Sequence, residues 1–308
     1  MSQRIPWSSH RVRLRDAVVE GYLVNDSPLR VGAGREPPLG SAVDLAVLRV
    51  AIGGKKVPYI PGSSLKGVFR STAMQLALAK GLHACSGLSG YTCMDQEFTE
   101  YGGSTLMGYV QDRLRVGDVM EAIRAFHEKA CLLCKMFGSP SFTGHVVFSD
   151  ADPLDERGEV VEVPIGVRTG IAIDRRTGAV HAGALYQVEY VEPGARFRFT
   201  IAATNLPNYA LGLLFKALRM LHEGWVRVGG FKTRGFGRVH VEDLRISIWG
   251  LTVEQGKLVA IDDKDLEVDL GSIARVEEHK VVAEGAVAWQ VVGKLEEVWE
   301  QCSARLKS

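Results

Sequence analysis

The sequence has no long apolar run and no excess of one charge. No stretch of its 308 residues approaches the roughly 18 consecutive apolar residues of a membrane helix. The N-terminal stretch "MSQRIPWSSHRVRLRD" lacks the apolar segment of a secretory signal. The 37 basic side chains are balanced by 36 acidic ones, which argues against a surface that binds nucleic acid through bulk charge. We therefore expect a cytoplasmic protein with no membrane contact, in which any anion site is local.

Familiar catalytic patterns are also missing. The sequence contains no G-x-S-x-G, no H-E-x-x-H and no paired-carboxylate motif, and its eight histidines are scattered. Gly230 and Gly235 have the first spacing of a phosphate-binding Walker loop, but Phe236 stands where that loop requires lysine. Serine hydrolases, zinc peptidases and nucleoside-triphosphate enzymes are therefore disfavoured.

The apolar pattern predicts an α+β fold. Alternating residues indicate strands within 11–25, 145–150 and 195–203, and the segment "SPLRVGAG" continues the first of these as strand, turn and strand. Helical spacing begins at Ser64 and again near Pro207. The order strand, strand, helix, insertion, strand, strand, helix, strand is typical of a ferredoxin-like (RRM-like) core with an antiparallel sheet.

The composition divides the chain into a core with additions. We expect the core in residues 1–80 and 138–245, a helical lid insertion in 81–137 that includes one helix over 119–137, and an extra C-terminal piece in 246–308. A glycine loop between two strands is expected within 225–242.

The stretch "YIPGSSLKGVFRS" carries the first anion-binding features. A helix that starts after Pro-Gly offers unpaired backbone N–H groups and the positive end of its dipole, and Ser63 or Ser64 is the expected N-cap. Lys66 and Arg70 are four residues apart and share one helix face, and Gly67 permits close approach of another backbone. The alternative is a capped surface helix with solvated cations.

The second such segment is "VGGFKTRGFGRV", residues 228–239. It combines four glycines with three cations and two aromatic rings, Phe231 and Phe236. Glycines free the backbone, cations such as Lys232 and Arg234 bind phosphates, and aromatic rings stack on bases, which together suit single-stranded nucleic acid. The alternative is a glycine-rich hairpin with solvated cations.

Four of the five cysteines lie in the insertion, which favours metal binding over disulfides. Cys131 and Cys134 form a C-x-x-C pair, and Cys85 and Cys93 lie upstream beside His83. Two separated pairs around one Zn²⁺ would brace an insertion too small for a large core. Because the upstream spacing is long, His83 is an alternative ligand to Cys85, and four buried free thiols are the other interpretation.

These segments together resemble one family. The stretches "LRVGAG", "SAVD", "YIPGSSLKGVFRS", "KMFGSPSFTGHVVFSDA" and "GGFKTRGFGRV" are similar, in this order, to the RAMP-superfamily backbone subunit of type III CRISPR effector complexes, of the III-A kind. The resemblance covers about residues 10–245. It departs from smaller members of the family in the long cysteine-containing lid, the C-terminal extension and the nearly neutral net charge of +1.

The resemblance implies an RNA-binding role. It implies a helical lid, and a protruding hairpin within 165–190 that wedges between guide and target bases. The partners it implies are guide RNA, target RNA, other subunits of a type III complex and copies of the chain itself in a filament. The RNA-binding residues that it implies, together with the cationic stretches, are Ser63, Ser64, Lys66, Arg70, Arg168, Arg175, Arg176, Lys232 and Arg234.

Asp44 matches the position at which the family's backbone subunits carry the aspartate needed to cut target RNA. A lone carboxylate beside a splayed phosphodiester can help hold Mg²⁺ or another divalent ion, or accept the proton of the 2′-hydroxyl that attacks. The resemblance thus implies a metal-dependent endoribonuclease within the assembled complex. The alternatives are a guide-binding scaffold without catalysis and, third, a metal-independent ribonuclease that processes precursor guide RNA.

Overall fold

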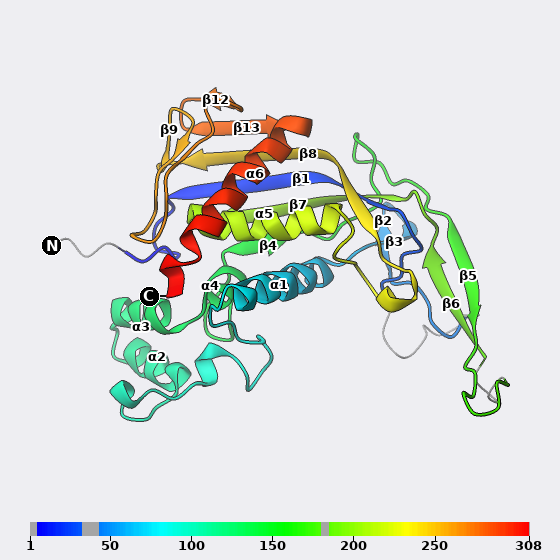
Figure 1. Cartoon of the computed structure of the whole chain (residues 1–308), viewed down its shortest axis with the longest axis horizontal. Coiled ribbons are helices and arrows are strands. Elements are labelled where there is room, and N and C mark those ends of the chain that lie inside the picture. The colour runs from blue at the N-terminus through cyan, green and yellow to red at the C-terminus, as the bar shows by residue number, and fades with distance from the viewer. Residues whose placement is uncertain (1–4, 33–42, 180–184, 308) are drawn as a thin grey trace.

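A computed structural model describes residues 5–32, 43–179 and 185–307. Its centre is a six-stranded antiparallel sheet with the order β12-β13-β8-β1-β7-β4 (Figure 1). The strands of this sheet are β1 (Arg15–Asn25), β4 (Val146–Phe148), β7 (Arg196–Thr204), β8 (Val239–Gly250), β12 (Arg275–Glu277) and β13 (Lys280–Glu284).

Four strands and two helices form the ferredoxin-like unit. In chain order they are β1, α1 (Gly62–Ala79), β4, β7, α5 (Asn208–His222) and β8. In the sheet, the neighbours β8-β1-β7-β4 are the fourth, first, third and second strands of this unit. This arrangement confirms the predicted ferredoxin-like α+β core.

Three helices cover one face of the sheet: α1, α5 and α6 (Gly285–Cys302) (Figure 1). Helix α5 buries its apolar stripe, in which Leu211, Leu214, Leu218 and Leu221 are each 1% exposed. Gly212 lets α5 and α6 pack closely, because a Cβ there would lie 2.1 Å from the carbonyl oxygen of Leu295. The predicted amphipathic helices therefore supply the core on this face.

The segment after β1 differs from the prediction. "SPLRVGAG" is not a strand of the sheet; within it Leu29 bridges Val191 and Gly32 bridges Val47, while residues 33 and 34 lie outside the described part. A hairpin that the pattern did not predict follows, formed by β2 (Arg49–Ile52) and β3 (Lys55–Pro58). Both the described part of "SPLRVGAG" and this hairpin lie outside the sheet and run toward the glycine loop. That loop was predicted between two strands, but no strand precedes it in residues 225–238.

The single helix expected over 119–137 is two α-helices, and a third α-helix precedes them in the insertion. The three are α2 (Leu106–Arg115), α3 (Val119–Lys129) and α4 (Leu132–Phe137). The chain is extended at Ala130, with φ −76° and ψ 141°, and the N–H of Cys131 donates to the Sγ of Cys93 at 3.3 Å. The contact between Cys131 and Cys93 thus lies at the break between α3 and α4. Helical periodicity alone does not encode this break.

The C-terminal extension joins the body. Strands β12 and β13 widen the main sheet, and β9 (Val253–Glu254), β10 (Lys257–Leu258) and β11 (Val268–Asp269) form a small sheet beside it. The buried residues of α6 belong to the same hydrophobic core as the insertion and the central sheet. Strands β5 (Ile165–Gly170) and β6 (Tyr186–Val191) pair as a hairpin that projects at the opposite end of the molecule from the C-terminus (Figure 1).

Candidate nucleic-acid interface and cysteine cluster

The N-terminus of α1 is capped differently from the prediction. Pro61 is the N-cap residue and no side chain caps the helix, so the expectation of a Ser63 or Ser64 cap was wrong. The first helical N–H, that of Gly62, donates to Oδ1 of Asp150 at 2.7 Å. A Cβ on Gly62 would lie 2.4 Å from the carbonyl oxygen of Phe148, so only glycine fits against the backbone at Phe148. One of the backbone donors that we assigned to phosphate therefore already has a carboxylate partner.

The remaining polar groups of this helix start face solvent. Ser63 and Lys66 are exposed and Ser64 is half-buried. Lys66 has no ion-pair partner among the residues that the structure describes. Gly67 is exposed next to Lys66, and nothing lies within 4 Å of the position that a Cβ would take. The helix thus presents an uncovered surface with a hydroxyl, a cation and a bare backbone.

Arg70 does not share that surface. Its guanidinium turns toward the insertion, where Nη1 donates to the carbonyl oxygen of Gly138 at 3.0 Å and Nη2 lies 3.7 Å from the Sγ atoms of both Cys85 and Cys134. A Cβ on Gly87 would lie 2.5 Å from Arg70 Nε, so the 81–93 segment packs flat against the guanidinium. The prediction that Arg70 binds RNA beside Lys66 is untested, but these contacts commit its nitrogens elsewhere.

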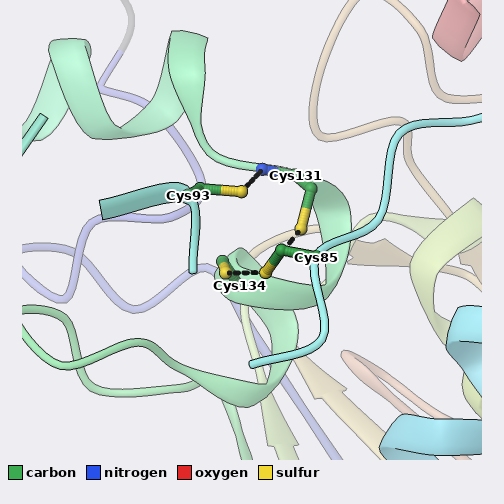
Figure 2. Close-up of side chains that lie close together, drawn as sticks. All are labelled: Cys85, Cys93, Cys131 and Cys134. Atoms are coloured by element: carbon green, nitrogen blue, oxygen red, sulfur yellow. Dashed lines mark hydrogen bonds between the residues drawn. The ribbon is translucent and has the colours of Figure 1, made fainter. Parts of the chain in front are cut away.

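The four cysteines of the insertion meet in one buried cluster. Cys85 follows α1, Cys93 begins the short 3₁₀ helix η1 (Cys93–Asp95), and Cys131 and Cys134 come from the start of α4 (Figure 2). All four Sγ atoms lie within 4.8 Å of one another, with 3.2 Å between Cys85 and Cys134 and 3.8 Å between Cys85 and Cys131. Hydrogen bonding, first with Cys134, lowers the pKa of the Cys131 thiol to about 6.

This donor set fits a tetrahedral metal ion. Four thiolates around Zn²⁺ at about 2.3 Å would be about 3.8 Å apart, which is within the range of this cluster. Cys85 is a full member of the group, whereas His83 is exposed, with its Nε2 3.8 Å from Cys93 Sγ and 3.4 Å from Gln96 Nε2. The geometry therefore favours four sulfur ligands over the alternative in which His83 replaces Cys85.

The glycine loop is built against the segment after β1. The N–H of Gly230 donates to the carbonyl oxygen of Arg30 at 2.8 Å. Gly229 has a left-handed φ of +79°, and a Cβ added to it would lie 2.3 Å from the same oxygen. Phe231 adopts a left-handed φ of 56°, and the 3₁₀ turn Lys232–Arg234 that follows is exposed. Two glycines thus allow close backbone packing, and the cations that follow them face solvent.

A cleft opens where this loop meets the β5–β6 hairpin. Its volume is about 350 Å³, and its lining includes Arg168, Tyr186, Phe231, Arg234 and Phe236. The Arg168 guanidinium lies 5.4 Å from the centre of the Phe236 ring, and Arg234 Nη1 donates to the Tyr186 hydroxyl at 2.7 Å. Both arginines are exposed and Tyr186 and Phe231 are half-buried, whereas Phe236 is buried, so the cleft offers cations together with two accessible rings.

Asp44 lies beside the loop end of the paired strands of the same hairpin, where Gln187 pairs with Thr169. It is exposed, and its Oδ2 accepts a hydrogen bond from the N–H of Gln187 in β6 at 2.7 Å. Just beyond it, Leu45 bridges Val188, so the Asp44 segment runs alongside β6. The carboxylate is therefore held beside the cleft, and its second oxygen has no hydrogen-bond partner among the residues that the structure describes.

An ion pair fixes this segment on its other side. Glu189 accepts from the N–H of Val47 at 2.8 Å and pairs with Arg49 at 2.5 Å. Burial alone would raise the pKa of Glu189, but the hydrogen bonds from Arg49 and Val47 outweigh it and lower that pKa. Glu189 thus stays ionised and holds the Asp44 segment against the hairpin.

The other predicted hairpin cations lie further out. Arg175 and Arg176 are exposed in the turn after β5, where the N–H of Arg176 donates to Asp174 Oδ1 at 2.8 Å. Residues 180–184, which belong to the predicted hairpin, lie outside the described part. The structure therefore brings Arg168 and Arg234 together near Asp44, and leaves Arg175 and Arg176 toward the tip.

Sequence reasoning missed several residues of this region. Tyr186 and Tyr190 lie on one face of β6, and Tyr190 is in ring contact with Phe236 at 5.7 Å. The alternation in "YQVEY" could have indicated their shared face. Asp150, which meets the start of α1, gave no such signal because it is distant in sequence from the helix.

The fold and these surfaces define a ferredoxin-like protein with a cationic, aromatic cleft. The sequence model of the RAMP superfamily matches residues 23–240, well over half of the chain. The chain belongs to the RAMP superfamily, and this membership points to a CRISPR-associated protein that binds RNA. A comparison with curated proteins finds no significant match. No described helix is long and apolar enough to cross a membrane.

Proposed function

We propose that this chain is a backbone subunit of a type III CRISPR effector complex that binds guide RNA as a single strand. The observation that carries the proposal is the convergence of Arg168 and Arg234 with the rings of Tyr186, Phe231 and Phe236, where the hairpin meets the glycine loop. Rings stack on bases of any sequence, and cations track the backbone, as a guide of variable sequence requires. The match to the RAMP superfamily over the core supports the same role.

The guide would contact several surfaces in turn. Its phosphates would bind the exposed start of α1, where Lys66 is the cation, and then the exposed turn of the glycine loop. The hairpin would separate bases of guide and target, with Arg168 in its strand β5. The residues assigned to RNA are Ser63, Ser64, Lys66, Arg168, Arg175, Arg176, Lys232 and Arg234. Other subunits, target RNA and further copies of the chain would complete the complex.

We further propose that Asp44 cleaves target RNA. Its free carboxylate oxygen would accept the proton of a 2′-hydroxyl, and that oxygen would attack the adjacent phosphorus in line. The bond from phosphorus to the 5′-oxygen would break, leaving a 2′,3′-cyclic phosphate and a 5′-hydroxyl that takes a proton from solvent. The contact of Asp44 with Gln187 supports this role because it fixes the carboxylate while leaving one oxygen available.

Asp44 also suits a Mg²⁺ ion, which proteins often bind through one or two carboxylates together with substrate phosphates. Such an ion would neutralise charge on the phosphate. Asp44 would be its protein ligand; Glu189 is already paired with Arg49 and the N–H of Val47.

The test compares two substitutions at Asp44 in complexes assembled on a guide RNA. Asp44→Asn keeps an oxygen that can accept from Gln187 N–H, whereas Asp44→Ala removes it. If the carboxylate performs chemistry, both variants should assemble normally and lose target-RNA cleavage with Mg²⁺ by about 100-fold or more. If Asp44 only holds β6, Asp44→Asn should cleave like the wild type.

The second candidate function is a guide-binding scaffold without catalysis. The hydrogen bond from Gln187 to Asp44 favours it, because a structural role already explains an aspartate at this position. Equal cleavage by complexes that carry the wild-type chain and both variants would assign the chain to this class. The RNA-binding surfaces would be unaffected by that outcome.

We also propose that the cysteine cluster holds one structural Zn²⁺. Cys85, Cys93, Cys131 and Cys134 supply a full set of four ligands, which leaves no coordination position for water or substrate. The ion would tie the end of α1 to η1 and α4 and so brace the lid. Metal analysis of the purified chain should give about one ion per molecule.

A further inference from the structure

A second cleft lies at the other end of α1. It has a volume of about 480 Å³ and lies between the insertion, the start of α5 and the C-terminal residues. Leu82 and His83, which follow α1, line it. Because α1 has 18 residues, this end is about 27 Å from the helix start that we assign to guide RNA. Figure 1 likewise places the C-terminus and α3 at the opposite end from the β5–β6 hairpin.

Four lysines line this cleft, and three of them come from three separate elements. Lys135 comes from α4, Lys264 from the loop before β11, and Lys307 from the last described turn. None of them has an ion-pair or side-chain hydrogen-bond partner within the described residues. The fourth lysine of the lining, Lys129, differs in this respect because it pairs with Glu100, as Lys257 does with Glu267 outside the cleft.

The cleft keeps these cations close together despite their repulsion. His127 also lines it; burial, followed by the charges of Lys135 and Lys264, lowers the pKa of His127 to about 4. The repulsion indicates that both ammonium groups lie near this imidazole. Cations that converge without ion pairs in a partly enclosed space are the arrangement expected of an anion site.

Three acidic residues, Glu128, Asp262 and Asp263, share the lining, and the charge of Asp263 opposes that of the lysines at His127, but none of the three forms a direct ion pair with Lys135, Lys264 or Lys307. Asp262 accepts hydrogen bonds from the Tyr209 hydroxyl at 2.7 Å and from the backbone N–H of Lys264 at 3.0 Å. Glu128 and Asp263 are exposed, and neither forms an ion pair with a lysine in the described structure. Within the described residues, none of the three lysines is therefore held in an ion pair, although burial lowers the pKa of Lys135 to about 8.

We propose that this cleft binds a phosphate group of a nucleotide-sized ligand, through Lys135, Lys264 and Lys307. Lysine ammonium groups bind phosphate as compact charges with three donors each. The volume is within the range of small-molecule sites. The phosphate belongs either to a free nucleotide or to the 5′ end of an RNA strand, two sources with the same chemistry.

The first experiment measures binding of inorganic pyrophosphate to the intact chain by isothermal titration calorimetry at low salt. Saturable binding of about one pyrophosphate per chain is expected. Lys264→Ala with Lys307→Ala should weaken it by about 100-fold, because each lost charge-assisted hydrogen bond costs about ten-fold in affinity, or about 1.4 kcal/mol. The matched control is Lys55→Ala with Lys56→Ala, two exposed lysines of β3 at a distant site.

Two outcomes would overturn the proposal: no saturable binding of pyrophosphate to the wild-type chain, or equal weakening by the control pair. Lys135→Met, which keeps the apolar stem, should reproduce the loss in a variant whose thermal unfolding matches the wild type. Competition against bound pyrophosphate then identifies the molecule that supplies the phosphate group. Displacement by ADP indicates a free nucleotide, and displacement by a 5′-phosphorylated oligonucleotide but not by its 5′-hydroxyl counterpart indicates an RNA end.

Discussion

Arg70 lies 3.7 Å from the Sγ of Cys134, so a cation of the helix that we assign to guide RNA points into the cysteine cluster. The same guanidinium contacts Cys85 and the carbonyl oxygen of Gly138. Arg70 therefore links α1 to both halves of the cluster. Four thiolates around Zn²⁺ carry a net negative charge, which a buried guanidinium would partly neutralise.

Replacing Arg70 should weaken metal binding. We expect Arg70→Ala to lower zinc affinity by about 10- to 100-fold, the usual effect of losing a partner of a metal ligand. Arg70→Lys, which keeps the charge but loses the planar fork, should lose less. Competition with a chromogenic zinc chelator measures both. An unchanged zinc affinity in Arg70→Ala would remove this role and return Arg70 to the set of RNA contacts.

Replacing Lys66 should weaken RNA binding without sequence preference. Each phosphate contact releases counterions, so Lys66→Ala should reduce the slope of log affinity against log salt by about 0.7 for a single strand. Fluorescence anisotropy over a salt series measures it. Arg70→Ala is the comparison variant, in which we expect the slope of the wild type. An unaltered slope in Lys66→Ala would refute a phosphate contact at this helix start.

Gly67 provides a test of close approach by RNA. A Cβ there would meet nothing within 4 Å, so Gly67→Ala should stabilise the free chain by about 0.5–1 kcal/mol through its better helix propensity. If the guide backbone runs against this bare surface, the same methyl group should weaken RNA binding. Denaturant unfolding and RNA titration of one variant give both numbers. Tighter or equal RNA binding would show that no RNA lies against Gly67.

The cysteines allow a matched pair of substitutions. Cys131→Ser removes one of four clustered sulfurs and should abolish stoichiometric zinc and lower the melting temperature of the chain. Cys302 is also buried but lies in α6 outside the cluster, so Cys302→Ser should retain about one zinc per chain. Elemental analysis and thermal unfolding report the two effects. A metal-free wild-type chain that is folded would instead favour four buried thiols.

Much of the core was predictable because its signals are local. The alternation in "RFRFTIAAT" gave β7, and the leucine spacing after Pro207 gave α5, since each pattern places apolar side chains on one face. The glycine loop and the C-x-x-C pair were found in the same way. In both cases neighbouring residues in the chain carry the chemistry.

Other features arise only from contacts between distant segments. Asp150 reaches Gly62 across 88 positions, and Gln187 reaches Asp44 across 143, so no local pattern could assign those partners. The break between α3 and α4 depends on Cys93, which lies 38 positions before Cys131. Such contacts decided which backbone donors remain available and where the helices end.

The ferredoxin-like class of the core, the cationic glycine loop and the four cysteines of the insertion could be predicted from the sequence alone, although two strands of the predicted order do not belong to the sheet. Only the tertiary structure decided the direction of each side chain. Lys66 and Arg70 look equivalent in sequence, yet one faces solvent and the other faces sulfur, because the insertion folds back over the third turn of α1 and covers Arg70 but not Lys66. Helical spacing defines a shared face, but what packs against that face is set by long-range contacts.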